Sequence, residues 1–330
     1  MHHRKRMAAV AAALATVLLA AGCASSEPEA PAADGITIQH AFGETVVPAD
    51  AKNVVTLGWG STDAAIALGV VPVAMPFDSY AGDDEGVLPW VREAVDAMGA
   101  DLPTVLPDAP EEPPYDAIDD ANPDVILAVY SGITQEQYDL LSEIAPVVAY
   151  SGEAWSTPWR DLISTVGKAL GKDAEAADVI AGIESELADA AAAHPEFAGK
   201  TIAAVWDVAG TFYVYKTADP RVEFLLDLGF VNAPSVDELA NGDATFYYTL
   251  SYEQLDQLSS DVVLNYADTE AGAEAFLTAP QTSVIPAVAA GHAAQVVGTE
   301  YISAVSPPTA LSIPWGLDRL VEVLAAASAE

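Results

Sequence analysis

The sequence predicts an α/β protein in which two lobes are joined by one long helix. Residues 173–194 (DAEAADVIAGIESELADAAAAH) repeat apolar side chains at steps of three and four, which is typical of an amphipathic helix. Strand-like and helix-like stretches alternate on both sides of this helix. Residues 115–127 (YDAIDDANPDVIL) match residues 252–264 (YEQLDQLSSDVVL) at a constant offset. Self-similarity on either side of a helix predicts two lobes built on one plan.

The first 22 residues have the character of a secretory signal peptide. Basic residues 4–6 precede an apolar run over residues 8–21, and small side chains lead up to Cys23. The run is too short to remain as a membrane-spanning helix. We therefore expect a signal peptide over residues 1–22 and a flexible tether over residues 23–35.

The chain is strongly acidic, with 12 Lys and Arg residues, 49 Asp and Glu residues and a formal net charge of −37. A charge of this sign repels nucleic acid and anionic lipid headgroups. A highly anionic ligand would need a local cluster of basic side chains, and the sequence offers few. Because Cys23 is the only cysteine, an internal disulfide or a thiolate metal site is excluded.

The N-terminal lobe is expected over residues 36–155. The succession of strand, helix and strand over residues 54–75 predicts a parallel pair with a right-handed crossover. Residues 76–113 are rich in Pro, Gly and Asp and carry several aromatic side chains, so we expect a binding loop there. The expected elements are a hairpin over 36–47 with its turn at Gly43-Glu44, strands 54–57 and 70–75, helices 61–68 and 88–98, the helix and strand of 115–127, helix 135–144 and strand 146–149.

Connecting helices are expected over residues 156–195, and the C-terminal lobe over residues 196–330. Asp173 can cap the long helix and Pro195 can end it, because the residue before a proline disfavours helical geometry. About 22 residues at ~1.5 Å each give a rod of roughly 33 Å, enough to cross a small domain. The other expected elements are helix 159–170, strands 201–206 and 212–215 with a turn at Gly210, helix 222–228, the helix and strand of 252–264, helix 272–277, strand 295–297 and helix 315–327.

Aromatic side chains gather in the loops that follow the predicted strands. Open parallel sheets bind ligands at the carboxyl ends of their strands, and aromatic rings suit a bulky organic ligand. The alternative for each ring is a place in a lobe core. The candidate ligand-binding residues are Trp59, Trp90, Arg92, Tyr130, Trp155, Tyr213, Arg221, Tyr247, Tyr248 and Tyr266.

Several stretches together resemble one family. Residues 19–23 (LAAGC) resemble the lipobox of bacterial lipoproteins, which implies a lipid anchor at Cys23. Residues 54–75 (VVTLGWGSTDAAIALGVVPVAM), 115–150 and 219–230 (DPRVEFLLDLGF) are similar to the iron–siderophore branch of the helical-backbone, class III substrate-binding proteins of ABC importers. The resemblance implies two Rossmann-like α/β lobes joined by a single long helix.

The same resemblance implies the function. A member of this family captures a ferric siderophore in the cleft between its lobes and delivers it to an ABC permease dimer for iron uptake. The protein would be a monomer at the extracytoplasmic face of the bacterial membrane, lipid-anchored, with no cofactor, no metal ligands of its own and no enzymatic activity. Because basic residues are scarce, a neutral or cationic hydroxamate complex fits better than a tris-catecholate.

Three residues receive roles from the resemblance. Arg221 stands where the family often has a ligand-binding arginine, whose guanidinium can donate to the oxygens around a chelated ferric ion. A surface ion pair is its alternative, and Arg92 is a candidate of the same kind. Asp116 and Glu253 occupy matching places in the repeat and resemble the acidic residues that dock on permease arginines. Their alternative is a favourable charge in the first turn of a helix.

Other functions are less well supported by the sequence. The same fold binding cobalamin or haem stays open, because a fold does not determine its ligand. A membrane-anchored α/β enzyme is disfavoured, because Gly58-Trp59-Gly60 lacks the third glycine of a dinucleotide-binding turn and no G-x-S-x-G elbow occurs. A bare-metal binding protein is disfavoured because His40, His194 and His292 are scattered.

Overall fold

The computed structural model describes residues 35–109 and 111–329. The predicted signal peptide, Cys23 and nearly all of the predicted tether lie outside these residues. Gly35, the last residue of that tether, instead begins strand β1 (Gly35–His40). Within the described ranges, no helix is both long and apolar enough to cross a membrane.

Five parallel strands form the sheet of the N-terminal half, which we define as β1 to α5. Their order is β5-β4-β3-β6-β7. All four residues of β6 are buried, as expected for a parallel strand covered on both faces. The elements of this half after the hairpin are β3 (Val54–Thr56), α1 (Ser61–Ala67), β4 (Ala74–Met75), α2 (Pro89–Met98), β5 (Thr104–Val105), α3 (Tyr115–Asp120), β6 (Val125–Ala128), α4 (Gln135–Ser142), β7 (Val147–Ala149) and α5 (Trp159–Ala169).

The predicted N-terminal hairpin is confirmed, but the predicted position of its turn is wrong. Strands β1 and β2 (Gly43–Pro48) pair antiparallel, with His40 opposite Gly43. The turn is therefore Ala41-Phe42, and Gly43-Glu44 begins the second strand. Gly43 has a φ of 122°, a backbone conformation that glycine adopts easily. The position that favours glycine is therefore the first residue of the second strand and not the turn.

The C-terminal half, β8 to α12, has a mixed sheet in the order β11-β9-β8-β12-β13, and β10 pairs with β8 beside this path. Strands β10, β12 and β13 lie parallel to the strand they pair with, whereas β9 and β11 form an antiparallel extension. The elements are β8 (Thr201–Val208), β9 (Thr211–Tyr215), α7 (Pro220–Asp227), β10 (Val231–Asn232), α8 (Pro234–Glu238), β11 (Tyr247–Leu250), the 3-10 helix Tyr252–Gln257, β12 (Val262–Ala267), α9 (Glu270–Thr278), α10 (Pro286–Ala290), β13 (Ala293–Val297), α11 (Thr299–Val305) and α12 (Ser312–Ser328).

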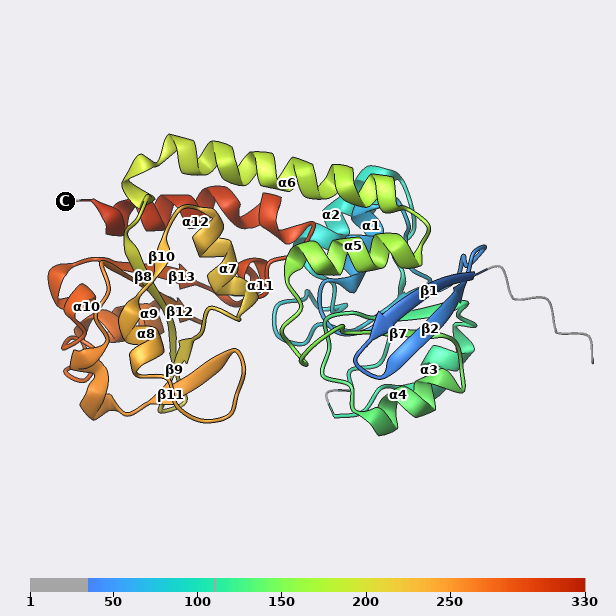
Figure 1. Ribbon diagram of the computed structural model, residues 1–330, viewed down its shortest axis with the longest axis horizontal. Coiled ribbons are helices and arrows are strands. Elements are labelled where there is room, and N and C mark those ends of the chain that lie inside the picture. The colour runs from blue at the N-terminus through green and yellow to red at the C-terminus, as the bar shows by residue number, and fades with distance from the viewer. Residues whose placement is uncertain (1–34, 110, 330) are drawn as a thin grey trace, which may run out of the picture. The chain divides into compact units, whose positions relative to one another are not determined.

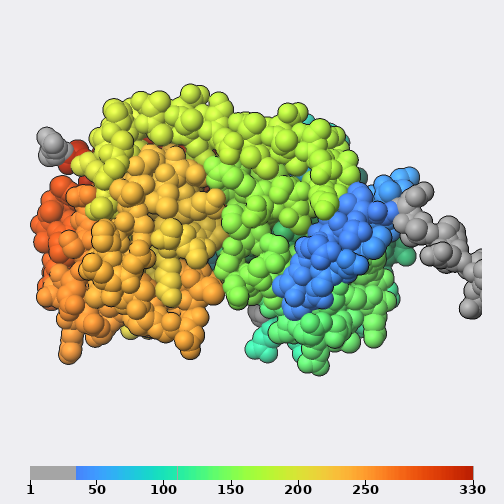
Figure 2. Space-filling view, viewed as in Figure 1, coloured from blue at the N-terminus to red at the C-terminus, as the bar shows by residue number. Residues whose placement is uncertain are grey.

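Helix α6 (Asp173–Ala193) joins the two halves and confirms the predicted long helix. Its 21 residues span about 32 Å at ~1.5 Å per residue. It packs on α5 of the N-terminal half and on α7 and α12 of the C-terminal half, and it lies across both halves in Figures 1 and 2. Pro195 begins a 3-10 helix just after α6 ends, as predicted, but the N-cap is Lys172 and not Asp173. The fold is therefore two α/β lobes and one connecting helix, while the lobe boundaries at residues 155 and 195 stay predictions.

The two copies of the sequence repeat occupy equivalent places. The first gives α3 and β6, and the second gives the 3-10 helix Tyr252–Gln257 and β12. Strand β6 pairs with β3, and β12 pairs with β8, so each copy supplies the strand beside the strand that comes first in its main sheet in chain order. The repeat predicted from the sequence is thus a repeat of structure.

Candidate ligand-binding cleft

A cavity of about 390 Å³ lies between the two halves. Its volume falls within the range of about 300–1,000 Å³ that is usual for small-molecule sites. The loops after β3 and β4 line one wall, and side chains from β8, α7, α11 and the segment before α12 line the other. The lining residues are Gly58, Trp59, Gly60, Thr62, Asp63, Met75, Pro76, Phe77, Asp78, Tyr80, Gly86, Leu88, Trp90, Val91, Trp206, Arg221, Ile302, Ser303, Ser306, Pro307 and Thr309.

Trp59 projects from a tight turn after β3. Gly58 has a φ of 70°, and a Cβ atom on it would lie 2.2 Å from the carbonyl oxygen of Tyr130. The backbone N–H of Trp59 donates to that same carbonyl at 3.0 Å. The glycine therefore lets the turn approach the segment that follows β6 closely, and Trp59 is held with 47% of its surface exposed.

Two further aromatic rings surround the Trp59 indole. The ring of Trp155 lies 5.0 Å from it and that of Tyr130 lies 6.1 Å from it, centroid to centroid. The Tyr130 hydroxyl donates to the backbone oxygen of Trp155 at 2.9 Å, and burial raises the pKa of this tyrosine. This aromatic cluster, Trp59, Tyr130 and Trp155, forms an apolar wall with one exposed ring.

A buried carboxylate at the base of the cavity links the two halves. Asp63, in the first turn of α1, is 2% exposed. Its Oδ1 accepts a hydrogen bond from Nε1 of Trp90 at 2.7 Å and another from the hydroxyl of Thr309 in the C-terminal half. Burial raises the pKa of Asp63, and these two donors oppose that change. Trp90 also packs on Trp315 of α12, with ring centroids 5.3 Å apart.

Arg221 supplies the charged side chain of the opposite wall. It is the second residue of α7 and is 7% exposed. Asp219, the N-cap of α7, accepts from the backbone N of Arg221 at 2.9 Å and from its Nε at 2.7 Å through Oδ1. The guanidinium carbon lies 3.8 Å from the centroid of the Tyr215 ring and 5.8 Å from that of Tyr266.

The electrostatics of this pair favour a charged arginine that can serve a ligand. Burial works against the charge of Arg221, but Asp219 and the surrounding tyrosines raise its pKa above the ordinary value. Burial also raises the pKa of Asp219, and Arg221 opposes that change. Within the part of the chain that the structure describes, the side-chain bonds of Arg221 use Nε alone, so both Nη groups remain available.

A second cavity of about 580 Å³ adjoins the first on the N-terminal half. The two share Gly58, Trp59, Phe77, Asp78 and Tyr80 among their lining residues. The second cavity also has Trp155, Asp108, Glu111 and Glu112 in its wall, and no Lys or Arg among its described lining residues. Together the two cavities offer aromatic surface, several carboxylates and one guanidinium.

The rim of the cleft carries a direct contact between the halves. The hydroxyl of Tyr80 donates to Oδ1 of Asp268 at 2.6 Å, and the Tyr80 ring lies 6.4 Å from that of Trp206. Burial raises the pKa of Tyr80, and the bond to Asp268 adds to that shift. Tyr80 belongs to the predicted binding loop, and that loop lines both cavities.

The structure brings six of the ten predicted ligand-binding residues to the cavities or directly behind their walls. Trp59, Trp90 and Arg221 line the first cavity, and Trp59 and Trp155 line the second. Tyr130 and Tyr266 are buried behind the residues that do so. Tyr213 and Tyr247 are half-buried partners on β9 and β11, with ring centroids 5.5 Å apart. Ligand contact by these residues remains a proposal.

Two predicted residues lie elsewhere. Tyr248 is 2% exposed and packs with Phe212, Val214 and Leu250 in a core on the other face of the sheet, because alternate residues of a strand point to opposite faces. Arg92 lines neither cavity. Its Nε donates to Oδ2 of Asp83 at 2.8 Å, and its Nη2 donates to Glu85 at 2.9 Å.

Residues that sequence reasoning missed come from α11 and from the segment between α11 and α12. Ser303 of α11 lines the cavity, as do Ser306 and Thr309 after it, although no motif marks them. Asp63 also lines the cavity, and no motif marks it as a binding residue. Among residues 35–109 and 111–329, no group of three or more His, Cys, Asp and Glu side chains is arranged to hold a metal ion.

The predicted docking residues are exposed at equivalent places. Asp116 lies in the first turn of α3, and Glu253 in the first turn of the 3-10 helix Tyr252–Gln257. Because these elements are the matching parts of the repeat, the two carboxylates are related by the same plan. This geometry agrees with a paired role and leaves the role itself a proposal.

Comparisons with known proteins give a consistent picture. A family model described as "Periplasmic binding protein" matches residues 54–296. The probable siderophore-binding lipoprotein YfiY of Bacillus subtilis (strain 168) is 28% identical over 299 residues, covering 86% of this chain and 88% of the relative. The Fe(3+)-citrate-binding protein YfmC of the same organism is 25% identical over 268 residues, 79% of each chain. The crystal structure of Streptococcus pneumoniae TIGR4 PiaA in complex with ferrichrome is 35% identical, with a TM-score of 0.82 over 89% of this chain and 98% of that chain.

Proposed function

This chain belongs to the family of periplasmic binding proteins, and from that premise we propose that it captures a ferric siderophore in the cleft between its halves and delivers it to an ABC permease for iron uptake. The observation that carries the proposal is the cleft itself. One wall presents the exposed Trp59 indole, and the other presents the Arg221 guanidinium with unused donors. A chelated ferric complex has the matching features, an apolar organic shell and negatively polarised oxygens around the metal.

The charges around the cleft support a neutral or cationic hydroxamate complex. Arg221 is the single basic residue among the described lining residues of the two cavities, while Asp63, Asp78, Asp108, Glu111 and Glu112 are acidic. A tris-catecholate with several negative charges would meet repulsion that one arginine cannot offset. The siderophore is cargo and already fills the coordination sphere of the iron, so the protein needs no metal ligands. We infer that no catalytic step occurs.

The location and partners follow from the same proposal. A signal peptide and a lipid on Cys23 would hold the protein at the extracytoplasmic face of the membrane as a monomer. Asp116 and Glu253 would then dock on basic residues of the two permease subunits, one contact from each half. Their exposure in matching first turns supports this, and it gives each half an equivalent contact with a dimeric partner.

A tryptophan-fluorescence titration tests the cargo. The full chain, in detergent, is titrated with ferrioxamine, ferrichrome, ferric enterobactin, haem and cobalamin. We expect quenching by the ferric hydroxamates with a Kd at or below about 1 µM, because a ligand in the cleft lies against the Trp59 indole. Nanomolar binding of ferric enterobactin without hydroxamate binding would contradict the hydroxamate assignment. Binding of haem or cobalamin alone would move the cargo to another class.

An uptake assay with matched charge reversals tests the docking residues. The double variant Asp116→Arg/Glu253→Arg should lose siderophore-dependent iron uptake in cells while its affinity for ferrichrome stays unchanged. The control is the double variant Asp119→Arg/Asp256→Arg, because Asp119 and Asp256 are exposed on the same two elements and also match in the repeat. Equal loss of uptake in the control, or lost affinity in the test variant, would defeat the assignment.

A further inference from the structure

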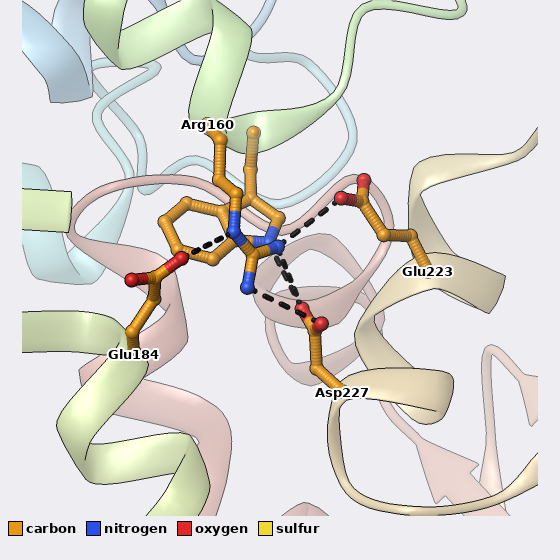
Figure 3. Close-up of polar contacts among 5 residues, drawn as sticks. Arg160, Glu184, Glu223 and Asp227 are labelled. Carbon is orange, nitrogen blue, oxygen red and sulfur yellow. Dashed lines mark hydrogen bonds and ion pairs between the residues drawn. The ribbon is translucent and has the colours of Figure 1, made fainter. Parts of the chain in front are cut away.

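One guanidinium ties together three helices at the junction of the two halves (Figure 3). Arg160, the second residue of α5, donates from Nε to Oε1 of Glu184 on α6 at 2.7 Å. Its Nη1 donates to Oε1 of Glu223 at 3.1 Å and to Oδ2 of Asp227 at 2.9 Å, both on α7. Its Nη2 donates to Oδ1 of Asp227 at 3.2 Å. We call these four residues the Arg160 cluster.

The guanidinium is oriented by more than its acidic partners. Its carbon lies 4.1 Å from the centroid of the Trp159 ring, and Nε1 of Trp159 donates to Oδ2 of Asp227 at 3.3 Å. A planar fork that stacks on an aromatic face and binds a carboxylate with two donors has a defined direction, which an ammonium group lacks. Trp159 and Arg160, adjacent residues of α5, thus both donate hydrogen bonds to the carboxylate of Asp227 on α7.

The Arg160 cluster differs from an ordinary surface ion pair. Exposed pairs contribute little to protein stability because water screens them. Here the side chains of Arg160 and Asp227 are 29% and 22% exposed, and three carboxylates converge on one cation. Burial raises the pKa of Glu223, and so does the neighbouring Asp227, while Arg160 opposes both effects. Loss of Arg160 would therefore leave like charges facing one another across the junction.

Helix α7 connects this cluster to the cleft. Glu223 and Asp227 are four residues apart and share one side of α7, and both bind Arg160. Arg221 lies at the N-terminal end of the same helix and lines the cavity. An eight-residue helix is a rod of about 12 Å. A shift of α7 against α5 must therefore move the cleft arginine relative to the wall that carries Trp59.

We propose that Arg160 is a positioning residue for ligand binding: by holding α7 against α5 and α6, it sets the place of the Arg221 guanidinium opposite the aromatic wall of the N-terminal half. This inference rests on the proposed function of the cleft. Arg160 itself lines neither cavity and acts through α7 alone. Its contacts join residues from both halves, whereas Arg92, which also pairs with two carboxylates, bonds only within the N-terminal half.

A double-mutant cycle on ferrichrome affinity tests the positioning role. Arg160→Met should weaken binding about tenfold, and Arg221→Lys, which keeps the charge beside Asp219 but removes the fork, should do the same. The variant carrying both changes should bind within about twofold of Arg221→Lys alone, because the group that Arg160 positions is already absent. If the double variant instead lost affinity by the product of the two single losses, the proposal would be overturned. Independent losses of that kind are expected when Arg160→Met damages the structure in general and does not act through Arg221.

Arg319→Met is the matched control. Arg319 also stacks on an aromatic ring, 4.2 Å from the centroid of Tyr301, and donates to the backbone oxygen of Val297 at 3.3 Å, but all of these contacts lie within the C-terminal half. Arg319→Met removes one positive charge, as Arg160→Met does. Because Arg319 holds no contact between the halves, the affinity for ferrichrome should stay within about twofold of wild type. Equal weakening by Arg319→Met and Arg160→Met would show that net charge, not position, is responsible. If Arg160→Met folds poorly, Asp227→Asn takes its place in the test. It keeps the shape of the junction, removes one carboxylate partner of Arg160 and should also weaken ferrichrome binding.

Small-angle X-ray scattering of the ligand-free protein separates this proposal from the identity of the cargo. Arg160→Met should have a larger radius of gyration than wild type and Arg319→Met, because the halves are less tightly held. If wild type fails to bind any ferric siderophore, the proposed function is wrong, yet the scattering comparison still decides whether Arg160 sets the junction. Identical scattering from Arg160→Met and wild type would overturn the proposal regardless of ligand.

Discussion

The N-terminal and C-terminal halves share a parallel core but differ in the segment after the first strand of the main sheet, which is β3 in one half and β8 in the other. In the N-terminal half, β3 ends at Thr56 and the chain turns at once through Gly58 into α1. In the C-terminal half, β8 continues to Val208, turns at Gly210 and returns as β9 before α7 begins. One half therefore presents a short turn with an exposed indole to the cleft, and the other presents a strand extension with tyrosines around a buried arginine.

The shared part of the plan is visible in two equivalent aspartates. Oδ2 of Asp124, just before β6, accepts from the backbone N–H groups of Lys52 and Asn53, both at 2.8 Å. Oδ2 of Asp261, just before β12, accepts from the backbone N of Thr201 at 2.7 Å and from its hydroxyl at 2.8 Å. Each aspartate thus joins the start of the repeat strand to the start of the neighbouring first strand. The repeat therefore keeps the aspartate that joins two neighbouring strands of each sheet, whereas the residues that line the two cleft walls differ.

Each half also buries one charged residue in the first turn of a helix that borders the cleft, and the two are satisfied differently. Asp63 of α1 accepts from two neutral donors, Trp90 and Thr309, and has no ion partner among the described residues. Arg221 of α7 is paired with the buried carboxylate of Asp219. The buried group of the N-terminal wall is therefore held by neutral donors, whereas the C-terminal wall contains a buried ion pair in which each charge depends on the other.

The largest expected effect comes from breaking that dependence. Arg221→Met should lower the free energy of unfolding by about 4 kcal/mol, because Asp219 is left buried without its partner. Asp63→Asn should change it by no more than about 1 kcal/mol, because the amide oxygen still accepts from Trp90 and Thr309. Urea unfolding of the ligand-free protein at pH 7 measures both. Adding Asp219→Asn to Arg221→Met should recover part of the loss, and a loss no greater than that of Arg319→Met would refute the comparison.

A matched pair of glycines tests the two turns. Gly58→Ala should lower the free energy of unfolding by about 3 kcal/mol, because its Cβ must displace the Tyr130 carbonyl and its φ is positive. Gly210→Ala should lower it by about 1 kcal/mol, because φ is 78° but no atom lies within 4 Å of its Cβ. Thermal and urea unfolding measure the difference.

Ligand affinity extends the glycine comparison to the cleft. Gly58→Ala displaces the turn that carries Trp59 and should weaken ferrichrome binding about tenfold, whereas Gly210→Ala should leave it unchanged. If both alanine variants were equally stable and bound equally well, the turn after β3 would not be the constraint on Trp59 that its geometry implies.

The sequence was most informative where local patterns decide the structure. Buried apolar runs such as Val125–Ala128 identified parallel strands, and the periodicity of residues 173–194 identified α6 to within one residue. Short elements held by their neighbours were missed, namely β5, β10, β11, α8, α10 and α11. Two-residue strands such as β5 and β10 exist because an adjacent strand offers hydrogen bonds, and a single segment carries no pattern that reveals this.

The site was only partly predictable because it depends on distant segments and on strand register. Tyr247 and Tyr248 are adjacent residues of the same type, so the sequence does not distinguish them. Only the pairing of β11 with β9 decides which of the two side chains faces a core. Thr309 reaches Asp63 across 246 positions of sequence, which no local pattern can indicate. The position of Arg92 had a usable signal, since Asp83 and Glu85 precede it by only 9 and 7 residues and pair with it in the structure.

The smallest effects should come from the two equivalent aspartates, and they test whether the halves use one device. Backbone hydrogen bonds from Asn53 and Lys52 hold the pKa of Asp124 below its usual value, and the backbone and hydroxyl of Thr201 do the same for Asp261. A lowered pKa means that the carboxylate stabilises the folded state above its unfolded pKa, and that this stability is lost as the pH falls through the folded pKa. Asp124→Asn and Asp261→Asn should therefore each lower the free energy of unfolding by about 0.5–1 kcal/mol at pH 7, which is less than is usual for hydrogen bonds to charged groups because both sites reach solvent.

Urea unfolding at pH 7 and pH 3 separates this device from a general effect of amide substitution. The difference between wild type and each variant should shrink at pH 3, where the wild-type carboxylates take up protons and lose the advantage that the asparagine variants already lack. Asp119→Asn, an exposed change on α3, should leave the free energy of unfolding unchanged at both pH values. If the Asp124→Asn and Asp261→Asn variants differed in how their free energy of unfolding changes with pH, the two copies of the repeat would share their backbone structure but not a stabilising carboxylate. Equal behaviour would instead show that each half uses the same carboxylate contact at the start of its central strands, although the two cleft walls differ.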